Sequence, residues 1–206
     1  MERHIIAISG GGFSEVKNSK IDTYLLNMKR KKRPLNIAFI ATASNGAQGY
    51  IDKFYEAFAN ERPTHITIQD FTRPDIQSYV NSLDIIYVGG GNTSNLLKTW
   101  QETKFDEVLK QAYEQGVILA GISAGAMCWF EHCYTQIDGE MWSVEGLGIL
   151  SGSYLPHADE ATIVPFEAWG QRHHITPLYA LKDEETIHFV DECLTLKLVE
   201  RMDNHV

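Results

Sequence analysis

The sequence predicts an α/β fold in which a mostly parallel sheet is covered by helices on both faces. Short apolar runs of strand length recur along the chain and alternate with segments of helical character. Strands that are buried on both faces read as near-continuous apolar runs, and this is the pattern of parallel sheets. The 206 residues, of which 44% are hydrophobic and 22% charged, suit one soluble domain that spans residues 1–206.

The expected strands begin close to the first residue. Three glycines close the first apolar run, as glycines do where a strand leads into a turn. Residues 65–68 alternate between polar and apolar side chains, which indicates a half-buried strand. In order, strands are expected at residues 5–9, 36–41, 65–68, 84–88 and 117–120, with a closing hairpin at 186–190 and 194–199.

The expected helices occupy the intervals between these strands. Pro74 stands in the first turn of one of them, where its missing N–H group leaves no hydrogen bond unmade. Gly116 follows the last of them, at the position where glycine commonly ends a helix. In order, helices are expected at residues 21–28, 50–60, 74–82, 94–98 and 105–115.

The loops that follow the carboxyl ends of these strands are expected to form the site, as in other open parallel sheets. The most informative loop is G-x-S-x-G at residues 121–125, with Ser123 in its centre. It lies between an apolar strand and a helix-tolerant segment, which is the context of a nucleophile elbow. The helix that follows offers free N–H groups and a positive dipole end to an oxyanion. A chance match of this short pattern is the alternative interpretation.

Composition narrows the class of protein. A net charge of −9 argues against a nucleic-acid partner. The longest apolar stretch, residues 116–130, is too short to cross a bilayer and contains glycine and serine, so no membrane contact is expected. Cys128, Cys133 and Cys193 show neither metal-ligand spacing nor an even set for disulfides, which indicates a reducing, cytoplasmic setting.

A serine nucleophile needs a base within hydrogen-bonding distance and an acid that orients the base. Among the eight histidines, His157 is favoured because it follows Pro156 in a loop, from which its side chain can reach into a cleft. The spacing of the acidic residues does not choose the acid. The candidates from the sequence are Asp138, Asp159, Asp183 and Glu184.

An oxyanion hole needs two preorganised N–H donors. Ala124, which follows the nucleophile, supplies one candidate amide, and the glycine-rich loop at residues 89–92 is suited to supply the other. Three consecutive glycines also occur in phosphate-binding loops. That alternative is weak here, because no G-x-G-x-x-G pattern and no P-loop lysine accompany them.

Two segments together resemble the peptidase E family of serine aspartyl dipeptidases, whose longer relatives are the cyanophycinases. They are V-G-G-G-N-T at residues 88–93, followed by Leu96 and Leu97, and G-I-S-A-G-A at residues 121–126. The resemblance covers nearly the whole chain. It implies a three-layer α/β sandwich similar to class I glutamine amidotransferase domains, with serine in place of cysteine at the elbow. It implies no metal or organic cofactor, a small peptide substrate, and a monomer or homodimer.

The resemblance also implies roles for individual residues. Ser123 matches the nucleophile, and His157 matches the base. Asp138 lies fifteen residues after Ser123, at the spacing of the acid in the dipeptidases, and is favoured as the acid. Glu184 matches the glutamate that takes this role in cyanophycinase-like members. The implied oxyanion donors are the amides of Gly91 and Ala124, and Asn92 is expected to shape the pocket.

Two positions depart from the dipeptidase pattern. Ile122 stands where the dipeptidases carry tryptophan. Trp169 stands where they carry an arginine that binds the aspartate side chain of the substrate, three residues before Arg172. Because tryptophan cannot form a bidentate ion pair with a carboxylate, the pocket is expected to be more apolar and peptides that begin with aspartate to be poor substrates.

The sequence therefore predicts a serine-type peptidase that acts on dipeptides or short peptides. Two alternatives remain open at this point. One is a relative that binds a small ligand without hydrolysing it, and the other is a small esterase or amidase.

Overall fold

The computed structural model describes residues 2–29, 34–137 and 140–200 and is built on a seven-stranded sheet. The strand order is β11-β10-β1-β5-β4-β2-β3. Five neighbouring strands pair in parallel, in the order β1-β5-β4-β2-β3. The other two strands, β10 and β11, are added next to β1 through antiparallel pairing. The strands are β1 (His4–Ile8), β2 (Asn36–Ile40), β3 (Arg62–Ile66), β4 (Ile85–Val88), β5 (Ile118–Ile122), β10 (Glu185–Val190) and β11 (Cys193–Val199).

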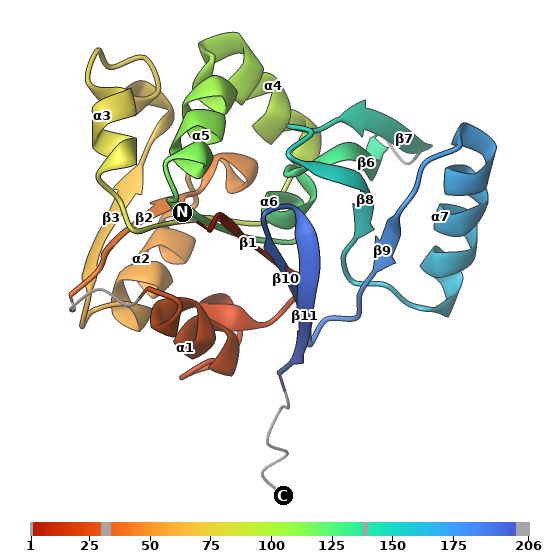
Figure 1. Cartoon of the computed structure of the whole chain (residues 1–206), viewed down its shortest axis with the longest axis horizontal. Coiled ribbons are helices and arrows are strands. Elements are labelled where there is room, and N and C mark those ends of the chain that lie inside the picture. Colours follow the sequence, from red (N-terminus) through yellow and green to blue (C-terminus); the bar gives the residue numbers. More distant parts are fainter. Residues whose placement is uncertain (1, 30–33, 138–139, 201–206) are drawn as a thin grey trace, which may run out of the picture.

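Helices cover both faces of this sheet (Figure 1). Successive side chains of a strand point to opposite faces, so Ile5 and Ile6 of β1 belong to two separate buried clusters. One face packs against α1 (Lys20–Asn27) and α2 (Gln48–Ala57). The other packs against α3 (Ile76–Asn81), α4 (Thr93–Thr103), α5 (Phe105–Glu114) and α6 (Ala124–Met127). The predicted α/β fold with a mostly parallel, doubly covered sheet is confirmed.

A second, four-stranded sheet follows the elbow, in the order β7-β6-β8-β9. The sequence did not predict it, because the segment after Ser123 was expected to continue as a helix. Instead α6 ends at Met127, and Phe130 packs its ring on Tyr154 at a centroid distance of 5.3 Å. The elements are β6 (Phe130–Ile137), β7 (Glu140–Glu145), β8 (Leu150–Leu155), β9 (Leu178–Ala180) and α7 (Glu160–His173). Figure 1 shows the second sheet and α7 to one side of the seven-stranded sheet.

Three short 3₁₀ helices complete the fold at Gly12–Ser14, Thr42–Ser44 and Ile68–Asp70. The last of them explains why β3 ends earlier than the sequence suggested. Asp70 accepts a hydrogen bond from the Thr67 amide at 2.8 Å and so turns the chain out of the sheet. Within the part of the chain that the structure describes, no helix has the length and apolar character needed to cross a membrane.

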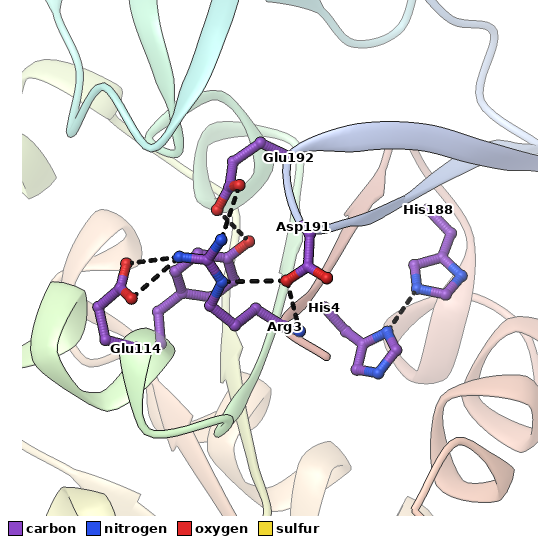
Figure 2. A network of polar contacts seen from close by, with 7 residues as sticks. Arg3, His4, Glu114, His188, Asp191 and Glu192 are labelled. Atoms are coloured by element: carbon purple, nitrogen blue, oxygen red, sulfur yellow. Dashed lines mark hydrogen bonds and ion pairs between the residues drawn. The ribbon is translucent and has the colours of Figure 1, made fainter. Parts of the chain in front are cut away.

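Arg3 ties the antiparallel edge of the sheet to its neighbours (Figure 2). Its guanidinium contacts the carboxylates of Glu114 at 2.9 Å, Asp191 at 3.1 Å and Glu192 at 3.0 Å. Exposed ion pairs are individually weak, but three carboxylates around one guanidinium form a network. The network joins the turn between β10 and β11 to the start of β1 and to the end of α5.

Two acidic residues, Glu200 and Asp22, are buried beside the loop that follows β1. The Glu200 carboxylate accepts hydrogen bonds from the Gly12 amide at 3.2 Å, the Ser19 hydroxyl at 3.0 Å and the Lys20 amide at 2.6 Å. Asp22 is only 7% exposed. Burial, together with the charge of Glu200, raises the pKa of Asp22 to about 7.

Asp22→Asn is expected to stabilise the protein more at pH 8 than at pH 5. The folded state keeps the Asp22 proton up to a pKa of about 7, whereas an unfolded chain releases it near its ordinary value of 3.8. The stability of the wild type therefore falls as the pH rises from about 4 to about 7, and an amide removes this loss of up to a few kcal/mol. Urea unfolding at both pH values measures the effect, with Asp52→Asn as the exposed control. An equal change at both pH values would contradict it.

Candidate active site

The carboxyl ends of β1, β5, β4 and β2 meet at one edge of the sheet and bring together the loops that the sequence singled out. The Ser123 amide donates to the Ile8 carbonyl at 2.9 Å, which joins the ends of β5 and β1. Across the sheet, the Gly89 amide donates to the Ile40 carbonyl at 2.9 Å. These bonds fix the positions of the loops around Ser123.

Ser123 occupies a sharp turn between β5 and α6, with φ 54° and ψ −115°. A positive φ is unfavourable for serine, and such strain is held only where the surroundings enforce it. Both flanking glycines are required by close backbone contacts. A Cβ atom on Gly121 would collide with the Gly125 carbonyl, and one on Gly125 would collide with the Val88 carbonyl. The turn has the form of a nucleophile elbow, which lifts the serine side chain above the sheet.

His157 lies opposite this serine, in the loop between β8 and α7. Its Nε2 atom is 2.9 Å from the Ser123 hydroxyl, within hydrogen-bonding distance. The His157 side chain is 48% exposed, so the pair is open to solvent on one side. The structure thus places the predicted base beside the predicted nucleophile.

Asp183 completes the row of side chains. Its Oδ1 atom is hydrogen-bonded to Nδ1 of His157, the ring nitrogen that faces away from Ser123. Glu184, which the resemblance implied as an acid, is the next residue but does not make this contact. Its backbone carbonyl instead accepts a hydrogen bond from the Glu200 amide at 2.7 Å. Asp138 lies outside the described residues.

Ser9, directly after β1, connects the loops that carry the base and the acid. Its hydroxyl accepts a hydrogen bond from the His157 amide at 2.8 Å and donates one to the Leu181 carbonyl at 2.9 Å. Ser9 is fully buried. Because His157 has a positive φ of 54°, its backbone depends on such contacts to hold its conformation.

Ser9→Ala is expected to lower kcat about tenfold with little change in KM, because a buried amide and carbonyl lose their partner and the imidazole shifts. Ser153→Ala is the matched control. Ser153 is equally buried, and its hydroxyl donates to the His132 carbonyl at 2.7 Å in the second sheet. Both variants should lose similar thermal stability, but only Ser9→Ala should lose kcat. Equal kcat values in the two variants would show that Ser9 acts through stability alone.

The sequence assigned the oxyanion hole to two backbone amides, those of Ala124 and Gly91. The Ala124 amide opens α6, and Gly91 belongs to the loop after β4. Within the described residues, neither amide is engaged in a hydrogen bond. The Gly90 amide, in contrast, points to the Tyr50 hydroxyl at 3.4 Å. A Cβ on Gly90 would lie 3.2 Å from the Ser123 Cβ, so glycine allows this loop to approach the nucleophile.

A pocket of about 320 Å³ opens beside the Ser123–His157 pair. Burial raises the pKa of the Tyr50 phenol on its wall, which keeps that group neutral. Among the described residues, no cluster of three or more histidine, cysteine or acidic side chains is arranged to hold a metal ion. The lining residues are Ser14, Glu15, Tyr50, Gly90, Ile122, Ser123 and His157.

Three residues expected to contact substrate do not line this pocket. Asn92 caps α4, where its side chain accepts a hydrogen bond from the Asn95 amide at 2.8 Å. Trp169 is only 9% exposed and stacks on Tyr134 at a centroid distance of 4.8 Å, in a core between α7 and the second sheet. Arg172 is exposed in the last turn of α7. The structure therefore places the Trp169 ring in this core and not on the wall of the pocket beside Ser123.

Comparison with known proteins identifies relatives of this chain. Residues 5–197 match the model of peptidase family S51. The "uncharacterized peptidase YgaJ" of Bacillus subtilis (strain 168) is 41% identical over 197 residues, which are 93% of this chain and 85% of that protein.

Two solved structures share the fold. A "putative peptidase E protein" from Listeria monocytogenes EGD-e superposes with a TM-score of 0.68 at 19% identity, over 98% of this chain and all of that one. A peptidase from an acI-B1 Actinobacterium superposes with a TM-score of 0.65 at 18% identity, over 92% of this chain and 84% of that one. At these identities the likeness shows the fold alone. The family model and the relative from Bacillus go further, and they confirm the resemblance seen in the sequence: the chain belongs to peptidase family S51.

Proposed function

We propose that the protein is a serine peptidase that hydrolyses dipeptides or short peptides. The observation that carries the proposal is the hydrogen-bonded row of Ser123, His157 and Asp183 at a nucleophile elbow. A neutral serine hydroxyl is a poor nucleophile, and this arrangement supplies the base and the acid that activate it.

In the proposed reaction, Nε2 of His157 takes the proton from Ser123 as its Oγ atom attacks the peptide carbonyl carbon. The negative charge that develops on the carbonyl oxygen is stabilised by the amides of Ala124 and Gly91. The imidazolium then gives its proton to the leaving amine, and the C–N bond breaks. Water, deprotonated by the same imidazole, hydrolyses the acyl-enzyme. Asp183 holds the imidazole in the required tautomer throughout.

The size of the pocket supports a short substrate. A volume of about 320 Å³ is at the lower end of small-molecule sites. A cleft of this size suits one or two amino-acid residues rather than an extended chain. The three free cysteines support a cytoplasmic setting for this activity.

Labelling with a fluorophosphonate, which reacts with activated serines, tests the mechanism first. The wild type is expected to be labelled on Ser123, as identified by mass spectrometry of the digested protein. A panel of dipeptides and simple esters then tests the substrate class. Labelling with hydrolysis of dipeptides supports the proposal, labelling with hydrolysis of esters alone supports an esterase, and a complete lack of labelling supports a relative that only binds a ligand.

A further inference from the structure

The pocket beside Ser123 contains one carboxylate that the proposed reaction does not use. Glu15 follows the 3₁₀ helix Gly12–Ser14 and lines the pocket together with Tyr50 and His157. Its Oε2 atom accepts a hydrogen bond from the Gly11 amide at 2.8 Å. Among the described residues, no hydrogen bond occupies its Oε1 atom. The side chain is therefore anchored through one oxygen and has the other available for a ligand.

The rest of the pocket wall leaves this carboxylate without a compensating cation. None of the other lining residues carries a positive charge unless His157 is protonated. Lys17 and Lys53 line a neighbouring cavity whose wall Glu15 also joins, but neither lysine lines this pocket, and Nζ of Lys53 donates to the Ser14 carbonyl at 2.9 Å. Asp183, behind the imidazole, adds a second negative charge near the site. The pocket therefore favours a cationic ligand and disfavours an acidic one.

We propose that Glu15 binds the cationic group of the first residue of the peptide, and so selects peptides with an ammonium or guanidinium group next to the scissile bond. The inference rests on the proposed function. The α-ammonium of any dipeptide is attached to the carbon that bears the scissile carbonyl, so it enters the pocket with that carbonyl. A lysine or arginine side chain at the first position offers the same chemistry from a second source. A carboxylate fixed by a backbone amide binds either group with little loss of freedom.

Glu15→Gln tests the charge while it retains an oxygen that can accept from the Gly11 amide. The substrates are norleucyl-leucine and lysyl-leucine, each with a free and an acetylated α-amine. If Glu15 binds the α-ammonium, the variant should lose about tenfold in kcat/KM on norleucyl-leucine and nothing on its acetylated form. If it binds the side chain, the loss should appear on acetylated lysyl-leucine and be absent on acetylated norleucyl-leucine. Either pattern supports the proposal.

Two controls distinguish a failure of the role of Glu15 from a failure of the proposed function. Glu56→Gln removes a carboxylate that lies outside the pocket, on α2, and should leave all four kcat/KM values unchanged. Fluorophosphonate labelling of Ser123 should be equal in the wild type and Glu15→Gln, because the reagent carries no cation. Normal labelling with equal kcat/KM on all four substrates in both proteins would overturn the role of Glu15. Loss of labelling in the wild type would instead overturn the proposed function.

A charge reversal gives a second, independent readout. In the wild type, aspartyl-leucine should be a poorer substrate than asparaginyl-leucine, because its carboxylate meets Glu15. Glu15→Lys should reduce or reverse this preference, and the change should shrink as the salt concentration rises. A wild-type preference for aspartyl-leucine that Glu15→Lys leaves unchanged would contradict the proposal.

If no dipeptide of the panel is hydrolysed although Ser123 is labelled, the role of Glu15 can be tested by the ability of a cationic ligand to protect Ser123 from labelling. Lysinamide carries both cationic groups and should slow the labelling of the wild type more than that of Glu15→Gln. Equal protection of the two proteins would overturn the proposal without reference to turnover.

Discussion

Ser123→Ala is expected to abolish fluorophosphonate labelling and to lower kcat by about 10⁴-fold or more, as loss of the nucleophile does in other serine peptidases. The substitution removes one oxygen atom, whose hydrogen bond is made to His157. The strained turn is enforced by its neighbours rather than by the hydroxyl, since Gly121 and Gly125 pack against backbone carbonyls. The fold and its thermal stability should therefore be retained.

The prediction is checked by measuring fluorophosphonate labelling, kcat and the burst of product released in the first turnover. Ser151→Ala is a suitable control, because Ser151 is an exposed serine on β8 that does not line the pocket. It should label and turn over as the wild type does. Hydrolysis near the wild-type rate in Ser123→Ala would exclude the serine mechanism. In that case the elbow would have a purely structural role.

The elbow could be read from the sequence because it is a local feature. An apolar strand, two glycines around a serine and a following helix all lie within about fifteen consecutive residues, and sterics dictate their conformation. His157 could be predicted for a similar reason, since it follows Pro156 in a loop. The parallel sheet was predicted from the apolar runs of its strands, and β1, β2, β4 and β5 are indeed buried on both faces.

The contacts made between distant segments could not be read in this way. Trp169 was interpreted by its place in a family pattern, but its environment depends on how α7 packs against Tyr134 of the second sheet. That sheet was itself missed, because the segment after Ser123 was expected to continue as a helix and because α7 lies between its paired strands β8 and β9. Ser9 and Glu15 belong to the segment around three glycines that the sequence did mark as a site loop, but nothing in their spacing pointed to a role.

The choice of acid shows the same limit most clearly. The sequence left four carboxylates open, and the family resemblance favoured Asp138 with Glu184 as the alternative. The position of Asp183 is set by the connection from β9 to β10, where Leu181 pairs with Leu155 through a 3.0 Å hydrogen bond. This contact brings the loop beside His157, and only the folded chain reveals it.

Asp183→Asn is expected to lower kcat by about 10² to 10⁴-fold, since an amide in this position favours the wrong tautomer of the base. The upper value applies to a buried aspartate. The Asp183 side chain is 65% exposed, so water can partly replace it and the lower half of the range is expected. KM should change little, because Asp183 does not line the pocket.

Glu184→Gln and Asp138→Asn are the matched comparisons, because each changes one candidate acid to its amide. If Asp183 orients His157, Glu184→Gln should retain activity close to that of the wild type, although it alters the adjacent residue. A larger loss of kcat in Asp138→Asn or in Glu184→Gln than in Asp183→Asn would assign the acid to that residue instead, and the hydrogen bond between Asp183 and His157 would then describe a resting arrangement rather than the catalytic one.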